Sequence, residues 1–301
     1  MRESIVAIGI IVWNGEKSIF QTLNSLLDQT YKNIRIYILD NQSTDQTLRI
    51  LQQYAIKDSR VQYCIDEKRR DIAAAQKVVF DRFLANYEYC MFSCDDDLYD
   101  HRFVEKLMLR LFSRSDLSLV YSKYQVFNGC NNISDVKNYP IYTENNSPLL
   151  NARNFLIFRN CIPLFFGIYK VDSLLTSMAY FKMVDKYGFN HENLMLLHFL
   201  INNQVDCIPE FYFFYRDKER IELYKNRGYK FSTLGIKKYY YSLIHNFHFT
   251  VAIYKIFSET KIPLAQRILL YILLPLTYIH RTIYALLIYP AVRQIVIFIK
   301  K

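Results

Sequence analysis

Three consecutive carboxylates follow an apolar run near residue 90, and this junction has the clearest chemical meaning in the chain. The run over residues 89–92 is typical of a buried strand, and Asp95, Asp96 and Asp97 come shortly after it. Adjacent carboxylates repel one another unless a cation lies between them, and Mg²⁺ and Mn²⁺ prefer carboxylate oxygens. We therefore predict that these three acids bind a metal ion. The alternative is a solvated acidic turn before a helix that starts near His101.

A second strand ends in a similar way. The β-rich run over residues 34–39 leads to Asp40 and Asn41, and Ser, Thr and Asp residues follow, as is typical of the start of a helix. An earlier apolar strand over residues 5–13 ends at a turn that contains Asn14. Polar side chains therefore follow each of these strands directly.

Strands and helical patterns alternate through the first hundred residues. Such alternation predicts an α/β fold with a mostly parallel, doubly wound sheet. In open sheets of this kind, ligands bind beyond the carboxyl ends of the strands. We therefore expect the ends of the strands at Trp13, Asp40 and Asp95 to line one crevice.

In this setting, residues 4–216 resemble the family 2 glycosyltransferases, which are inverting enzymes with the GT-A nucleotide-sugar-binding fold. The resemblance rests on the turn at residues 13–16, on the polar motif at residues 40–47 and on the acidic motif at residues 95–97. It implies a GT-A domain that binds a nucleotide-diphospho-sugar, with a UDP-sugar favoured, together with Mg²⁺ or Mn²⁺.

The resemblance also implies roles for individual residues. Asp40 would contact the nucleotide base, Asp96 would bind the metal, and Asp95 would contact the ribose or the metal. Asp97 could share either role, because three consecutive acids can be aligned with the family's acidic motif in more than one way. Asp40 as an ordinary acid at a helix N-terminus is the alternative. Further implied contacts to the donor involve four residues: Asn14, Asn41, Ser43 and Arg69.

The segment around residue 70 departs from the family pattern, because Asp71 replaces a glycine. This departure leaves two interpretations open for the cationic side chains of Arg69, Arg70 and Lys77. They could contact the diphosphate, or they could belong to a solvated helix start.

An inverting transfer needs a carboxylate that takes the proton of the acceptor hydroxyl. The resemblance implies that this base lies where the chain has His191-Glu192-Asn193, followed by matching residues over 208–216. Asn193 stands where an acid is usual, so Glu192 is the predicted base. His191 is the alternative, since its ordinary pKa suits proton transfer near neutrality, and Asp185 is a further candidate. Glu192 as a helix N-terminal acid is the structural alternative.

Composition favours a folded protein of the reducing cytosol. The chain has 301 residues, of which 51% are apolar, and six cysteines without a C-x-x-C spacing. Cys90 and Cys94 are expected to be small buried hydrophobic residues. Residues 5–13 lack the flanks of a secretory signal and are expected to form the first strand.

The last third of the chain carries the basic excess. Residues 211–301 contain 15 Lys and Arg against four Asp and Glu, while the whole chain has a net charge of +10. From residue 262 onward, apolar blocks too short to span a bilayer alternate with basic residues, and Pro275 and Pro290 interrupt them. We expect a GT-A domain over residues 1–215 and a basic amphipathic helical extension over residues 216–301.

This extension is expected to contact a membrane surface and not nucleic acid, because it is rich in Leu and Ile. Packing against the catalytic domain is the alternative. The combined prediction is a peripheral enzyme on the cytoplasmic face of the plasma membrane. It would transfer a sugar to a lipid-linked glycan in cell-surface polysaccharide or lipopolysaccharide synthesis, with residues 124–160 as an irregular acceptor loop. A non-catalytic, membrane-associated GT-A-like partner subunit and a nucleotidyltransferase on a related fold are the alternatives.

Overall fold

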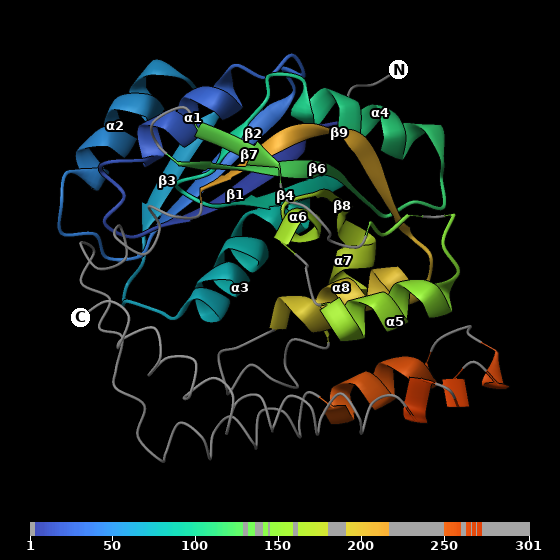
Figure 1. Ribbon diagram of the computed structural model, residues 1–301. Helices are drawn as coiled ribbons and strands as arrows, with labels where there is room; N and C mark the ends of the chain where they lie inside the picture. The colour runs from blue at the N-terminus through green and yellow to red at the C-terminus, as the bar shows by residue number, and fades with distance from the viewer. Residues whose placement is uncertain are drawn as a thin grey trace, which may run out of the picture.

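The computed structural model describes residues 4–128, 132–135, 141–143, 145–158, 162–179, 191–216, 250–259, 263–265, 267–268 and 270–272. Within these ranges, nine strands form one sheet with the order β3-β2-β1-β4-β8-β6-β9-β5, and β7 pairs with β6. Helices cover both faces of this sheet (Figure 1).

The first half of the sheet is parallel, as the sequence predicts. It consists of β1 (Val6–Val12), β2 (Ile34–Asp40), β3 (Val61–Ile65) and β4 (Tyr89–Ser93). The apolar residues of β1 are almost entirely buried, because helices cover it on both faces and neighbouring strands flank it. Since parallel strands point the same way, the carboxyl ends of these four strands share one edge.

The second half of the sheet is mixed, and here the predicted mostly parallel arrangement does not continue. The strand β8 (Ile168–Lys170) is antiparallel to β4 and to β6 (Leu119–Asn128), whereas β9 (Val205–Arg216) is parallel to β6. The short strands β5 (Leu98–Tyr99) and β7 (Asn132–Asp135) add antiparallel pairs. Because β8 is reversed relative to both β4 and β6, β9 points the same way as β4 and ends at the same edge.

Two local predictions have different outcomes. The helix expected near His101 is confirmed as α4, which begins at Phe103 and ends at Ser113. The segment expected to be an irregular acceptor loop, residues 124–160, contains the end of β6, the strand β7 and the helix α5 (Pro148–Phe158).

The helices divide between the two faces of the sheet. In Figure 1, α1 (Ile19–Leu27), α2 (Thr47–Lys57) and α4 lie above the sheet. The other helices lie below it: α3 (Ile72–Arg82), α5, α6 (Ile162–Phe165), α7 (Val171–Met178) and α8 (His191–Ile201). The 3-10 turn η1 (Leu84–Asn86) leads into β4.

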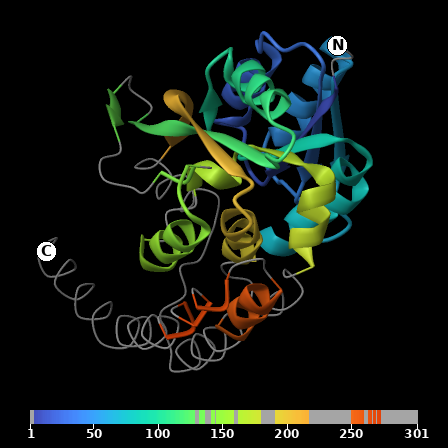
Figure 2. The ribbon, with the colours of Figure 1, turned by 90° about the vertical axis from the view of Figure 1, so that its right-hand side faces the viewer.

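Part of the C-terminal third packs on this domain. Residues 250–258 form a helix beyond α5 and α8 (Figures 1 and 2), and four of its side chains are buried in the main core: Ala252, Ile253, Ile256 and Phe257. Tyr254 stacks on Tyr271 with ring centroids 5.0 Å apart. The alternative of packing against the catalytic domain therefore holds for this helix.

Among the residues that the structure describes, no helix is long and apolar enough to cross a membrane. Pro275, Pro290 and the apolar blocks after residue 272 lie outside the described residues. The predicted boundary between residues 215 and 216 stays a prediction.

Candidate active site

The loops that follow β1 and β2 are tied to each other by side chains predicted to contact the donor. The backbone N–H of Asn14 donates to Ser43 Oγ at 2.8 Å, and Asn14 Oδ1 accepts from the backbone N–H of Thr44 at 2.8 Å. The backbone N–H of Gly15 donates to Thr47 Oγ1 at 2.8 Å. Asn14 has a positive φ of 52°, which asparagine tolerates better than most residues. Asn14 and Ser43 therefore hold the two loops together at the crevice.

Asp40 is buried at the end of β2, where the sequence places the contact to the base. Its Oδ1 accepts a hydrogen bond from the backbone N–H of Ser43 at 3.2 Å. Burial raises the pKa of Asp40 above its ordinary value, and the hydrogen bonds from Ser43 oppose this shift. The carboxyl group of Asp40 is therefore buried and accepts hydrogen bonds from Ser43, and its contact with a nucleotide base stays a prediction.

Asn41 joins the end of β2 to the segment before α3. Its Nδ2 donates to the carbonyl of Arg70 at 2.9 Å, and its Oδ1 accepts from the backbone N–H of Arg70 at 2.9 Å. The Arg70 guanidinium forms an ion pair with the buried carboxylate of Asp66 at 2.7 Å. Asn41 and Arg70 thus position the loop, and their predicted contacts with the donor stay predictions.

Arg69 lies over the end of the first strand. Its guanidinium carbon is 3.3 Å from the centroid of the Trp13 ring, which is a cation–π contact next to Asn14. Asp71, which replaces the glycine of the family pattern, caps α3, because its Oδ1 accepts from the backbone N–H of Ala74 at 2.9 Å. The structure thus places the cation of Arg69 at the crevice and explains Asp71 as a helix cap.

The acidic motif forms a compact cluster after β4. One ligand atom each from Cys94, Asp96 and Asp97 lies within 4.8 Å of the others, and the two acids are 2% and 0% exposed. Asp95 is buried but stands outside this cluster, so the geometry does not support its predicted metal role, and its ribose contact stays a prediction. Cys94 was expected to be buried and inert, but it is half-buried and joins the acids.

Arg216, at the end of β9, fastens this cluster to the rest of the domain. Its backbone N–H donates to Asp97 Oδ1 at 3.0 Å, and its Nε donates to the carbonyl of Asp96 at 2.9 Å. Its Nη2 donates to Gln21 Oε1 at 2.6 Å, and its guanidinium lies 4.5 Å from the centroid of Phe127. In the sequence, Arg216 stands out only as the last of the matching residues over 208–216, and nothing there predicts its contact with the acids.

Two further residues support the acidic loop from α1 and β5. Thr22 Oγ1 donates to the carbonyl of Asp97 at 2.8 Å, and the buried Tyr99 hydroxyl donates to Ser93 Oγ at 3.0 Å. Burial, followed by the charge of Asp97, raises the pKa of Tyr99 well above its ordinary value. Tyr99 is therefore a neutral hydrogen-bond donor beneath the carboxylates.

The predicted base lies in a different element. His191 begins α8, and Glu192 is half-buried in its first turn. Because the turn at residues 202–204 connects the end of α8 directly to the start of β9, α8 points its first turn back toward the carboxyl edge (Figure 1). Glu192 does not belong to the acidic cluster, and the side chain of His191 and all of Asp185 lie outside the described part of the chain.

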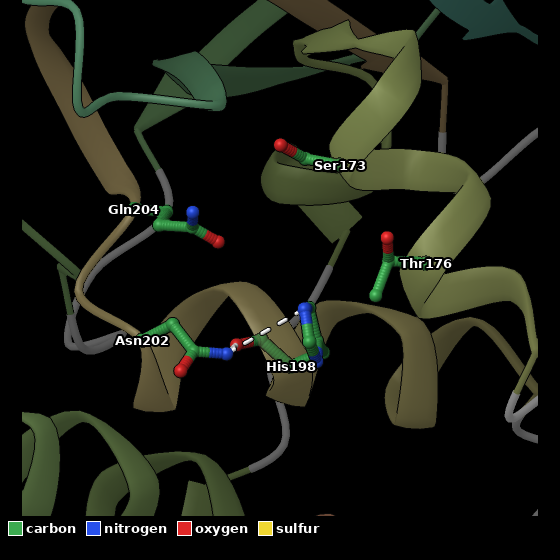
Figure 3. A pocket seen from close by; sticks show the side chains of 5 residues that line it. All are labelled: Ser173, Thr176, His198, Asn202 and Gln204. Atoms are coloured by element: carbon green, nitrogen blue, oxygen red, sulfur yellow. Dashed lines mark hydrogen bonds between the residues drawn. The ribbon is translucent and has the colours of Figure 1, made fainter. Parts of the chain in front are cut away.

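A separate cavity of about 320 Å³ lies at the other end of α8. Its five lining side chains come from α7, α8 and the segment before β9 (Figure 3): Ser173, Thr176, His198, Asn202 and Gln204. Burial lowers the pKa of His198, and Asn202 Nδ2 donates to the His198 carbonyl at 2.9 Å. This cavity contains none of the predicted site residues, so it is not part of the crevice.

The fold and the crevice define a class of protein. Four parallel strands end at one edge beside a buried acid, a stacked arginine and a cluster of possible metal ligands, which is the arrangement of a nucleotide-sugar-binding α/β protein. The family described as glycosyl transferase family 2 matches residues 7–173, and the chain belongs to this family. The family predicted from the sequence is thereby confirmed.

Individual relatives agree with this assignment. Chondroitin synthase from Escherichia coli is 29% identical over 251 residues, which cover 81% of this chain and 35% of that protein. The E. coli UDP-Glc:alpha-D-GlcNAc-diphosphoundecaprenol beta-1,3-glucosyltransferase WfaP is 41% identical over 86 residues, covering 27% of this chain and 33% of that protein. The alignments thus span about a third of the length of each relative.

A solved structure shows the same fold. The S. aureus TarS 1–349 fragment in complex with UDP superposes with a TM-score of 0.61 at 16% identity, covering 87% of this chain and 68% of that one. At this identity the match shows the fold alone, and it confirms the predicted GT-A fold.

Proposed function

We propose that this protein transfers a sugar, with inversion, from a nucleotide-diphospho-sugar to a hydroxyl of a lipid-linked glycan in cell-surface polysaccharide or lipopolysaccharide synthesis. One observation carries the proposal: buried Asp40 and the Asp96–Asp97 pair converge on the same edge of a parallel sheet, where such folds bind ligands. The glucosyltransferase WfaP is named for an acceptor on diphosphoundecaprenol, which supports a lipid-linked acceptor here.

The donor would bind across the ends of β1, β2 and β4. Asp40 would accept an N–H of the nucleotide base, and a uracil ring offers such a donor, so a UDP-sugar is favoured. Arg69 would place positive charge beside the phosphates, because its guanidinium is held flat on Trp13 at the end of β1. Asn14, Asn41 and Ser43 would act mainly by holding the loops that shape this crevice.

A divalent cation fits the acidic cluster, because its charge would offset the mutual repulsion of the buried carboxylates. Asp96 and Asp97 would hold Mg²⁺ or Mn²⁺, and Asp95 would contact the ribose. When bound, the ion would supply positive charge that offsets the charge of the leaving diphosphate.

Glu192 would act as the general base, with His191 as the alternative. The acceptor oxygen attacks C1 of the sugar, the bond from C1 to the diphosphate oxygen breaks, and the hydroxyl proton passes to the Glu192 carboxylate. Because attack comes from the face opposite the leaving group, the configuration at C1 is inverted, and no enzyme nucleophile is needed.

A peripheral position on the inner face of the plasma membrane follows from the C-terminal residues. Leu264, Ile268 and Ile272 are spaced by four residues and are 64%, 50% and 59% exposed, which forms an apolar stripe. With the basic residues of the C-terminal third, this stripe suits insertion at the headgroup level of an anionic bilayer.

Vesicle flotation tests the membrane proposal. The chain should float with vesicles that contain phosphatidylglycerol, and a double variant, Leu264→Glu with Ile268→Glu, should lose most of this binding. Ile56→Glu is the control, since Ile56 is also an exposed apolar residue, 86% exposed, but lies on α2. Equal loss in both variants, or none in either, would contradict a role for the stripe.

Calorimetric titration with UDP, GDP and dTDP, each with and without Mn²⁺, tests the donor and metal assignments. UDP should bind only with Mn²⁺, and Asp96→Ala should abolish this binding while urea unfolding stays cooperative. Asp116→Ala is the control, because Asp116 is an exposed acid paired with Arg114 far along the chain from the site. A folded sample that binds no nucleotide, or that binds UDP equally well without metal, would refute the proposal.

A further inference from the structure

We infer that Cys94 is a thiolate ligand of the metal, so that the site prefers a thiophilic transition metal over Mg²⁺. This inference rests on the metal site of the proposed function and goes beyond it in naming a sulfur ligand. It starts from the cluster of Cys94, Asp96 and Asp97, in which a cysteine takes a position that an all-oxygen site would give to a carboxylate.

The backbone explains why these three side chains meet. Cys94 directly follows β4, and a bend at residues 95 and 96 brings Asp96 and Asp97 beside it. The backbone N–H of Arg216 donates to Asp97 Oδ1 at 3.0 Å. Asp95, the first residue of the bend, is left out of the cluster.

The distances allow a shared ion. A metal–thiolate bond is about 2.3 Å and a metal–carboxylate bond about 2.0–2.2 Å, so two ligand atoms on one ion can be separated by up to about 4.5 Å. The sulfur and the carboxylate oxygens lie within 4.8 Å of one another. Binding would therefore require only a small contraction of the cluster.

The surroundings of Cys94 differ from those of the other described cysteines. Cys90 is fully buried in the core and burial raises the pKa of its thiol, while burial also raises the pKa of Cys64 and Cys207. Only Cys94, among the described cysteines, belongs to a group of possible metal ligands. On binding, the S–H bond breaks, the metal–sulfur bond forms, and the proton leaves to solvent.

A thiolate changes which ion is preferred. Mg²⁺ favours a shell of oxygen ligands, whereas thiolate ligands favour softer ions, and the affinity of a mixed site rises from Mn²⁺ through Co²⁺. We therefore expect the affinity of the chain to rise in the order Mg²⁺, Mn²⁺, Co²⁺.

Co²⁺ is the probe that tests this inference, because a sulfur-to-cobalt bond gives a charge-transfer absorption band in the near ultraviolet. Titration of the purified full chain with Co²⁺ should produce this band, and Cys94→Ser should abolish it. The same variant should weaken Co²⁺ binding by at least about tenfold. Removing a residue that only supports a metal ligand already lowers metal affinity by about this factor. Cys64→Ser is the matched control, since Cys64 is also half-buried, and it should keep the band.

A second variant reverses the preference. Cys94→Asp would make the cluster all-carboxylate, so the band should disappear while calorimetry shows tighter Mg²⁺ binding than in the unmodified chain. Co²⁺ that binds without the band, or a band that survives in Cys94→Ser, would overturn the inference.

The outcome is separable from that of the proposed function. If the unmodified chain binds UDP only with metal but shows no sulfur band with Co²⁺, the inference alone fails. If the chain binds neither Co²⁺ nor UDP, both fail.

Discussion

Arg216 offers the sharpest test of how the acidic loop is held. Its guanidinium reaches the carbonyl of Asp96 with Nε and Gln21 Oε1 with Nη2, and it lies over the ring of Phe127. A lysine carries the same charge, but its single ammonium group cannot reproduce this planar fork. Arg216→Lys therefore removes the geometry and keeps the charge, while the backbone N–H bond to Asp97 remains.

The size of the effect follows from these contacts. A hydrogen bond from a charged group contributes about 1.5–3 kcal/mol, and a partly desolvated cation–π contact contributes roughly 0.5–2 kcal/mol. If lysine keeps one of the two hydrogen bonds and loses the ring contact, the free energy of unfolding should fall by about 2–5 kcal/mol. Arg216→Met, which loses both hydrogen bonds, should cost more.

Urea unfolding measures this loss, and calorimetry with UDP and Mn²⁺ measures its effect on the site. Arg102→Lys is the matched control: the Arg102 Nε lies 3.3 Å from Asp100 Oδ1 and its guanidinium lies 5.4 Å from the Tyr212 ring, but its side chain is 47% exposed. This control should lose less than about 1 kcal/mol, as exposed pairs do.

Two results would refute this reasoning. If Arg216→Lys costs no more stability than Arg102→Lys, the buried contacts do not contribute as argued. If Arg216→Lys loses stability but binds UDP with unchanged affinity, Arg216 supports the fold and does not position the acidic loop.

Three further predictions concern the interior. Because burial raises the pKa of Asp40, ionisation of this carboxyl destabilises the folded state. Asp40→Asn should therefore raise the free energy of unfolding at pH 7, and this gain should be absent below about pH 4. The same variant should weaken UDP binding. A Cβ at Gly167 would lie 2.5 Å from a backbone oxygen, whereas one at Gly9 would meet side-chain atoms at 2.5 and 3.0 Å. In urea unfolding, the stability lost in Gly167→Ala should therefore exceed the roughly 1–3 kcal/mol expected for Gly9→Ala. Phe257→Ala should lower the free energy of unfolding by about 3–5 kcal/mol, because Phe257 is buried, whereas Leu264→Ala should change it very little, because Leu264 is exposed. Equal losses in the two variants would show that the 250–258 helix does not contribute to the core.

The first half of the fold could be predicted from the sequence, because each of its strands is a short, mostly apolar run that can be recognised from neighbouring residues alone. The strand β1 is one residue shorter at each end than the expected range 5–13, and β2 extends one residue beyond the expected range 34–39. Strands buried on both faces appear as short apolar runs, and polar loops that form helix starts separate them. The position of Asp40 and of the acidic motif at the ends of such strands follows from the same pattern.

The second half could not be predicted, because its pairing depends on contacts between distant segments. The sequence does not show that β9 passes between β6 and β5, or that the reversed strand β8 separates β4 from β6. For the same reason, the contact of Arg216 with a loop 119 residues earlier in the chain was missed. The place of Cys94 beside the acids could not be predicted, because it depends on the bend at residues 95 and 96, which the sequence does not reveal.

The contacts at the carboxyl edge indicate which part of the site is fixed before ligands bind. Asn14, Asn41, Ser43 and Arg216 form hydrogen bonds with other groups of the chain, so the loops are held without a donor. Asp40, Asp96 and Asp97 are buried carboxylates that raise the energy of the folded state when they are charged together. The large apolar core beneath them compensates for this cost. A cation and the N–H groups of a nucleotide would relieve it directly, so ligand binding and stability should be coupled at this edge.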